Sequence, residues 1–115
     1  MDLQAFYDNI GEDYELIFRR LLSAERIEKY LSIFFNDNNM DDLKTQIFGN
    51  DMQSALNTSH SLKGVTATLG FEHFADNIST LHGLLKNNET DKAKDVCQQI
   101  LKEYEIIYNV YRSFK

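Results

Sequence analysis

The chain has no proline in 115 residues, and this absence constrains its fold more than any other feature. Apolar residues recur at spacings of three and four along almost the whole length, which is the period of amphipathic helices. The glycines and asparagine pairs stand where these patterns stop or could stop, with one exception, Gly64. The sequence therefore predicts an all-helical protein.

Turn signals and capping residues divide the chain into helices. Ser23 and Thr90 are suited to N-caps and Gly70 to a C-cap. The expected helices cover residues 3–9, 13–22, 24–36, 40–48, 52–69, 71–86 and 91–113. Short connections between helices of this length favour antiparallel neighbours. We expect one domain over residues 1–115, an antiparallel four-helix bundle with short additional N-terminal helices.

Composition and charge exclude several classes of function. With 43% hydrophobic and 26% charged residues, the chain resembles soluble globular proteins. A net charge of −6 disfavours nucleic acid and anionic membranes as partners, because both require a basic surface. No apolar run is long enough to span a membrane, and the acidic start lacks a signal-peptide pattern. The single cysteine, Cys97, fits a reducing compartment. We expect a cytoplasmic protein that is a monomer.

The helix over 52–69 places one histidine away from its predicted core stripe. At about 100° per residue, the stripe opposite His60 contains Ala55, Thr58, Leu62, Val65, Thr66 and Leu69. The face of His60 carries Lys63, Gly64 and Ala67, together with Gln53, Leu56, Asn57 and, past the helix end, Phe71. A lone helical histidine is usually a core or surface residue without a role. Here the neighbouring lysine and glycine point to a functional site.

The chemistry of phosphoryl transfer gives each of these residues a role. A neutral imidazole nitrogen is a nucleophile towards phosphorus, and histidine titrates near physiological pH. Lys63, three residues on, is adjacent on the helix surface and could bind phosphoryl oxygens. Glycine inside a helix costs about 1 kcal/mol relative to alanine, so Gly64 is expected to serve a purpose. We interpret it as clearance beside His60 for an approaching partner.

His60-Ser61-Leu62-Lys63-Gly64, followed by Leu69-Gly70, resembles the H-x-L-K-G-x-x-x-x-L-G signature of histidine-containing phosphotransfer (HPt) domains. Chain length and helix order are similar to those of small stand-alone bacterial members over nearly the whole chain. The resemblance implies a helical bundle that shuttles phosphoryl groups between aspartates of receiver domains. It implies that His60 is the phosphoacceptor, Lys63 its electrostatic support and Gly64 the clearance. Response-regulator receiver domains and hybrid sensor histidine kinases are the implied partners.

One position departs from the family pattern. In such domains a Gln or Glu about 22 residues beyond the histidine often steadies the ring nitrogen that is not phosphorylated, and here His82 occupies this position. An imidazole could make the same hydrogen bond, although a protonated second histidine would repel the first. His82 is therefore a candidate orienting residue, with a plain surface role as the alternative.

Other chemistries lack their signatures. A di-iron or di-manganese bundle needs paired E-x-x-H motifs, which the sequence does not contain, so no metal site is expected. There is no glycine-rich phosphate loop for ATP, and we expect a phosphoryl carrier rather than an enzyme. It would need no cofactor of its own, with Mg²⁺ held by the partner receiver domain. Two alternatives stay open, namely a helical adaptor that binds receiver domains without phosphorylation, and the substrate domain of a chemotaxis-type kinase.

The face around His60 is also the predicted docking surface for the receiver domain. Protein interfaces usually centre on apolar residues with a polar rim. The apolar candidates are Leu56, Ala67 and Phe71, and the rim would be formed by Gln53, Asn57 and Lys63.

Overall fold

A computed structural model describes all 115 residues and is entirely helical apart from turns. Its elements are α1 (Leu3–Asn9), α2 (Tyr14–Leu21), α3 (Ala24–Asn36), α4 (Asn39–Phe48), α5 (Met52–Thr68), α6 (Glu72–Lys86) and α7 (Thr90–Ser113). Every boundary lies within one residue of the predicted one. The all-α prediction is confirmed.

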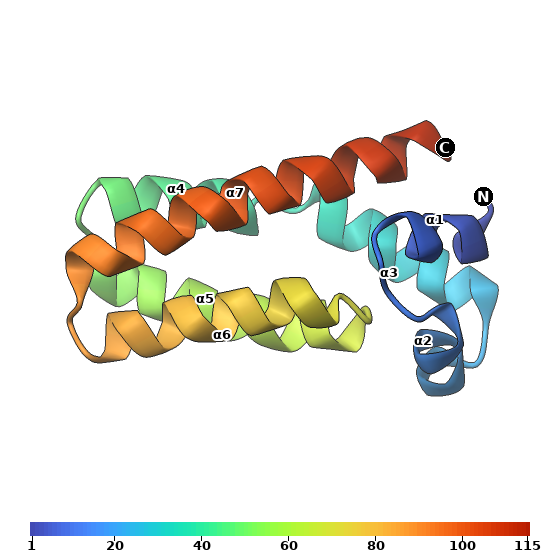
Figure 1. The fold of residues 1–115 in the computed structure, drawn as a ribbon, viewed down its shortest axis with the longest axis horizontal. Coiled ribbons are helices and arrows are strands. Elements are labelled where there is room, and N and C mark those ends of the chain that lie inside the picture. The colour runs from blue at the N-terminus through green and yellow to red at the C-terminus, as the bar shows by residue number, and fades with distance from the viewer.

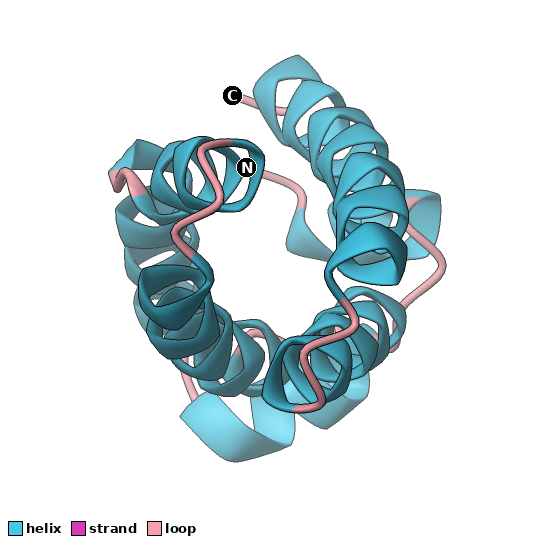
Figure 2. Ribbon diagram, turned by 90° about the vertical axis from the view of Figure 1, so that its left-hand side faces the viewer, coloured by secondary structure: helices cyan, strands magenta, loops and turns pink.

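Helices α4 to α7 form an antiparallel four-helix bundle. Each contacts its two neighbours, in the cyclic order α4, α5, α6, α7, and Figure 1 shows successive helices running in opposite directions along the long axis. Figure 2 looks along that axis and shows the helices surrounding a common centre. Helix α7 has 24 residues and is therefore about 36 Å long, which lets it run past the bundle to contact α1.

The three N-terminal helices gather at one end of the bundle, at the right in Figure 1. Hydrogen bonds attach them to the turn between α5 and α6. The Tyr7 hydroxyl donates to the Leu69 carbonyl at 2.6 Å, and Arg20 Nη1 donates to the Ala67 carbonyl at 2.6 Å. The carboxylate of Glu12 accepts from the backbone N–H of His73 at 2.9 Å. These contacts fix α1 and α2 relative to the C-terminal end of α5.

Residues with a left-handed backbone terminate several of the helices. Gly70 has φ 78°, and it directly follows the last turn of α5 in a Schellman motif, with Phe71 N–H donating to Thr66 and Gly70 N–H to Ala67. Asn50 and Asn88 occupy the same conformation after α4 and α6. The C-terminal role predicted for Gly70 is confirmed.

The two predicted N-caps have different outcomes. Ser23 Oγ accepts from the backbone N–H of Arg26 at 3.3 Å, which confirms it as the cap of α3. Thr90 is wrong as a cap, since it is already the first residue of α7 and Glu89 precedes it without a side-chain capping bond. The Thr90 hydroxyl instead donates back to the Asn88 carbonyl.

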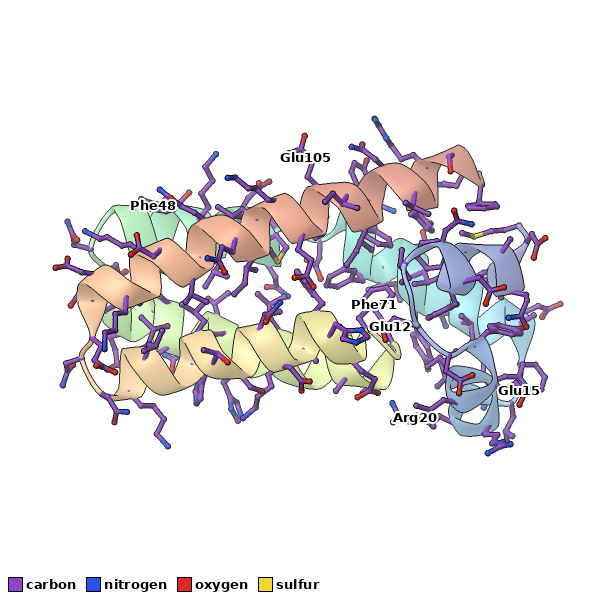
Figure 3. All side chains as sticks on the ribbon, in the orientation of Figure 1. Glu12, Glu15, Arg20, Phe48, Phe71 and Glu105 are labelled. Atoms are coloured by element: carbon purple, nitrogen blue, oxygen red, sulfur yellow. The ribbon has the colours of Figure 1, made fainter.

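An aromatic cluster fills the core where the bundle meets the N-terminal helices. Phe71 is fully buried, and its ring centroid lies 5.8–6.3 Å from those of Phe6, Tyr7, Phe34 and Phe35. Figure 3 shows Phe71 and Glu12 at this junction, with Arg20 on α2 below them. Phe71 was predicted on the docking surface, and that prediction is wrong because the turn after Gly70 directs the ring inward.

No helix combines the length and apolar character that crossing a membrane requires.

Candidate functional site

Helix α5 and its C-cap residue bury a seam of five residues and leave His60 exposed. The buried positions are spaced by four and three residues in alternation: Ala55, Ser59, Leu62, Thr66 and Leu69. This spacing is that of a helix packed along a narrow seam. The two polar members are satisfied within their own helix, since the Ser59 hydroxyl donates to the Leu56 carbonyl at 2.9 Å and the Thr66 hydroxyl to the Leu62 carbonyl at 2.7 Å.

The seam corrects the predicted core stripe. The buried side of α5 is rotated towards Ser59, which lies outside the predicted stripe opposite His60. Val65 lies at the opposite edge of the stripe and is consequently exposed. Tyr30 of α3 is exposed as well.

A second histidine lies beside His60. The ring centroids of His60 on α5 and His82 on α6 are 5.6 Å apart, with 42° between the ring planes. His82 Nδ1 lies 3.1 Å from the Ser59 hydroxyl oxygen, within hydrogen-bonding distance. The structure thus brings together the two histidines that the sequence singled out, although they are 22 residues apart.

The charges around this histidine pair are positive. Burial lowers the pKa of His82 below its ordinary value, and Lys63, His60 and Lys86 lower it further, while a hydrogen bond with the Leu56 backbone acts in the opposite direction. Neither lysine takes part in any of the five ion pairs of the structure. An acidic chain therefore places two unpaired ammonium groups, from two helices, around its histidine pair.

Gly64 opens the other side of His60. It is exposed, and a Cβ at this position would meet no atom within 4 Å. Beside it lies a groove of about 810 Å³ between α5 and the N-terminal helices, lined among others by Tyr30, Ile33, His60, Ser61, Gly64 and Val65. Tyr30, Ile33 and Val65 expose 40%, 53% and 38% of their surface. Apolar surface therefore adjoins His60 on the Gly64 side.

The residues predicted for docking are distributed differently from the expectation. Gln53 and Asn57 are exposed. Leu56 is half-buried and packs against the core, so its predicted exposure is wrong. Ala67 is half-buried, and Arg20 binds its carbonyl. The sequence analysis did not select Ile33 and Val65 for docking. The signal that could have identified them is that each is an apolar residue outside the buried seam of its helix.

Other reactive side chains lie apart from this site. His73 Nδ1 lies 3.1 Å from the Glu12 carboxylate, beside the turn between α1 and α2. Cys97 is buried, and burial raises the pKa of its thiol to about 11, as expected for a packing residue. No group of three or more His, Cys, Asp or Glu side chains is arranged to hold a metal ion.

Two glycines of this region are expected to respond oppositely to alanine. Gly64→Ala should raise the free energy of unfolding by up to about 1 kcal/mol, because the position is helical and open. Gly70→Ala should lower it by about 1–2 kcal/mol or more, since its left-handed φ disfavours a side chain and the new Cβ would lie 3.2 Å from that of Ile17. Urea unfolding followed by circular dichroism measures both. A large loss of stability in Gly64→Ala would show that Gly64 has a packing role.

The Hpt domain family model matches residues 4–109 of the chain. The match covers nearly the full length, so the protein belongs to the Hpt domain family. No curated protein and no solved structure matches the chain significantly. Hpt domains are phosphoryl carriers of two-component signalling that interact with receiver domains and histidine kinases. Membership therefore places this chain in phosphotransfer signalling.

Proposed function

We propose that the protein accepts a phosphoryl group on His60 and exchanges it with the aspartate of a receiver domain in a His–Asp phosphorelay. The observation that carries this proposal is the surroundings of His60. It is an exposed imidazole with the unpaired Lys63 one turn further along α5, the ring of His82 beside it and an open face at Gly64. A surface histidine without a role needs none of these neighbours.

The transfer step uses groups that this chain supplies. A neutral ring nitrogen of His60 attacks the phosphorus of the receiver's aspartyl phosphate with its lone pair. The bond between phosphorus and the carboxyl oxygen breaks, and the carboxylate leaves with the electron pair. The phosphoryl group on the imidazole then carries close to two negative charges, which Lys63 and Lys86 are placed to offset. Mg²⁺ is expected on the receiver domain, and the carrier needs no cofactor of its own.

His82 is proposed to orient His60. Its ring is fixed through Nδ1 against Ser59, a buried residue of the helix that carries His60. The side chain that lies next to His60 is thereby held by a group that cannot move independently of α5. A positioned neighbour of this kind reduces the number of orientations that the nucleophile can adopt.

The receiver domain is proposed to dock on the groove side of His60. Tyr30 and Ile33 of α3 and Val65 of α5 provide the exposed apolar centre of this surface. Gly64 lies between that centre and His60, so a partner seated there reaches the imidazole without a steric obstacle. Of the residues that the sequence predicts for docking, Gln53 and Asn57 are polar members of the same face of α5.

The proposal is tested by incubating the protein with a receiver domain that carries a radiolabelled phosphoryl group. We expect an acid-labile, base-stable label to appear on the carrier and to map to His60. Stable binding of the phosphorylated receiver without any transfer would instead identify a helical adaptor. Transfer that maps to His73 or His82 would overturn the assignment of His60.

A further inference from the structure

The His60–His82 pair carries an inference that rests on the proposed function and goes beyond it. We propose that His82 is a phosphate-binding residue that gains its positive charge only when His60 is phosphorylated. Proton binding at His82 and phosphoryl retention at His60 would then be coupled, and the carrier would hold its phosphoryl group more firmly as the pH falls.

The hydrogen bonds around His82 assign its tautomer. The one proton of the Ser59 hydroxyl is donated to the Leu56 carbonyl at 2.9 Å. The Ser59 oxygen therefore meets His82 Nδ1, 3.1 Å away, with a lone pair. We therefore assign the proton of the neutral ring to Nδ1 in this contact, which leaves Nε2 free to bind a second proton.

The charges that act on His82 keep this second proton off in the unphosphorylated protein. They are His60 and Lys63 of α5 and Lys86 of α6, and neither a carboxylate nor a charged group of α7 is among them. Burial is the largest contribution, and together these effects lower the pKa of His82. Burial and these charges therefore favour the neutral form of the ring, next to two ammonium groups.

Phosphorylation of His60 reverses the electrostatic balance. The ring centroids of His60 and His82 are 5.6 Å apart, and phosphorylation adds nearly two negative charges to the His60 ring. A nearby opposite charge raises the pKa of a histidine, by about one unit or more when it lies within a few ångströms. A proton from solvent then binds Nε2 of His82. Lys63, Lys86 and protonated His82 together face the phosphoryl group. A Gln or Glu at this position could not change its charge in this way near neutral pH.

The direction of the pH dependence follows from linkage. The pKa of His82 is higher in the phosphorylated than in the unphosphorylated protein, so protons favour the phosphorylated form. The additional retention of the phosphoryl group on His60 is fully present when the pH lies below both pKa values of His82. It is lost as the pH rises through the higher of the two values. If the two values differ by about one unit, the coupling is about tenfold, and it is equal in both directions.

The test needs no partner, because phosphoramidate can phosphorylate exposed histidines directly. In that reaction the phosphorus–nitrogen bond of phosphoramidate breaks, ammonia leaves with the electron pair, and a His60 nitrogen forms the new bond. The His73→Gln variant is used so that only His60 and His82 contribute imidazole signals to the NMR spectrum. The pKa of His82 is measured by NMR titration before and after phosphorylation, with mass spectrometry to locate the phosphoryl group.

We expect the pKa of His82 to rise by about one unit when His60 is phosphorylated. In the unphosphorylated protein, Lys86→Gln should raise the pKa of His82 slightly, because it removes a nearby positive charge, whereas Lys102→Gln on α7 should leave it unchanged. A His82 pKa that stays the same or falls while His60 carries the phosphoryl group would overturn the inference and leave the carrier function intact. If His60 accepts nothing from phosphoramidate or from a phosphorylated receiver, both proposals are wrong.

Discussion

Replacing His60 with Gln is expected to lower phosphoryl acceptance from a receiver domain by roughly 10³-fold or more, since the change removes the nucleophile itself. Glutamine retains the polarity and most of the volume of the side chain. His60 is exposed and forms no hydrogen bond that supports the fold, so stability should change by less than about 0.5 kcal/mol. Transfer is measured by the appearance of labelled carrier over time, and the fold by circular dichroism.

His73→Gln is the matched control for this experiment. Its imidazole is also exposed, but it lies at the start of α6 beside Glu12 and away from the two lysines of the site. The control should transfer at the rate of the unmodified protein. Equal loss of transfer in both variants would indicate a general effect of removing histidines and would contradict the assignment of a single phosphoacceptor.

The Ile33→Asp variant is expected to bind the receiver domain at least about tenfold more weakly, which corresponds to about 1.4 kcal/mol. Ile33 is 53% exposed and lines the groove beside His60, so a carboxylate there should cost little stability in the free protein. In the complex it would be buried against apolar surface without a partner. Isothermal titration calorimetry with an unphosphorylated receiver measures the difference.

Ile106→Asp provides the control for docking. Ile106 is 65% exposed and lies on α7, the helix diagonally opposite α5 in the bundle. The two substitutions are chemically identical and differ only in the surface they alter. If the Ile106 variant loses affinity and the Ile33 variant does not, the receiver binds a different face.

Leu56 illustrates why the docking surface could not be located from sequence. On a helical wheel it lies close to His60, and it was expected to be exposed. The neighbouring helix α6 covers that side, so Leu56 is half-buried and packs against the core. A wheel gives the direction of a side chain but does not show which neighbouring helix lies there. Leu56→Asp is consequently expected to destabilise the fold as well as any complex.

The helix boundaries, in contrast, were predictable because they depend on local chemistry. Asn50, Gly70 and Asn88 each follow a helix with a left-handed backbone, a conformation that glycine and asparagine adopt most readily. Their positions can be read without knowing the tertiary packing. The order of these signals, with short connections between long helices, also predicted the antiparallel bundle.

The candidate site was partly predictable, for a different reason. His60, Lys63 and Gly64 lie within one turn of a single helix, so their proximity follows from helical geometry alone. The seam that contains Ser59 was missed because the predicted stripe was placed directly opposite His60, although the alternating spacing of the seam was present in the sequence. The contact of Ser59 with His82 depends on how α5 and α6 pack, which no local pattern specifies.

The attachment of the N-terminal helices has a consequence for how the docking surface behaves in solution. One wall of the groove belongs to α5, and the other belongs to α2 and α3. Tyr7 of α1, Glu12 between α1 and α2, and Arg20 of α2 attach the N-terminal helices to the end of α5 and the start of α6. The width of the groove therefore depends on how the N-terminal helices are attached to the end of α5. Partial detachment of these helices would remove the surface that receives the partner while leaving His60 and its lysines in place. Phosphoryl transfer and partner binding therefore depend on different parts of the fold.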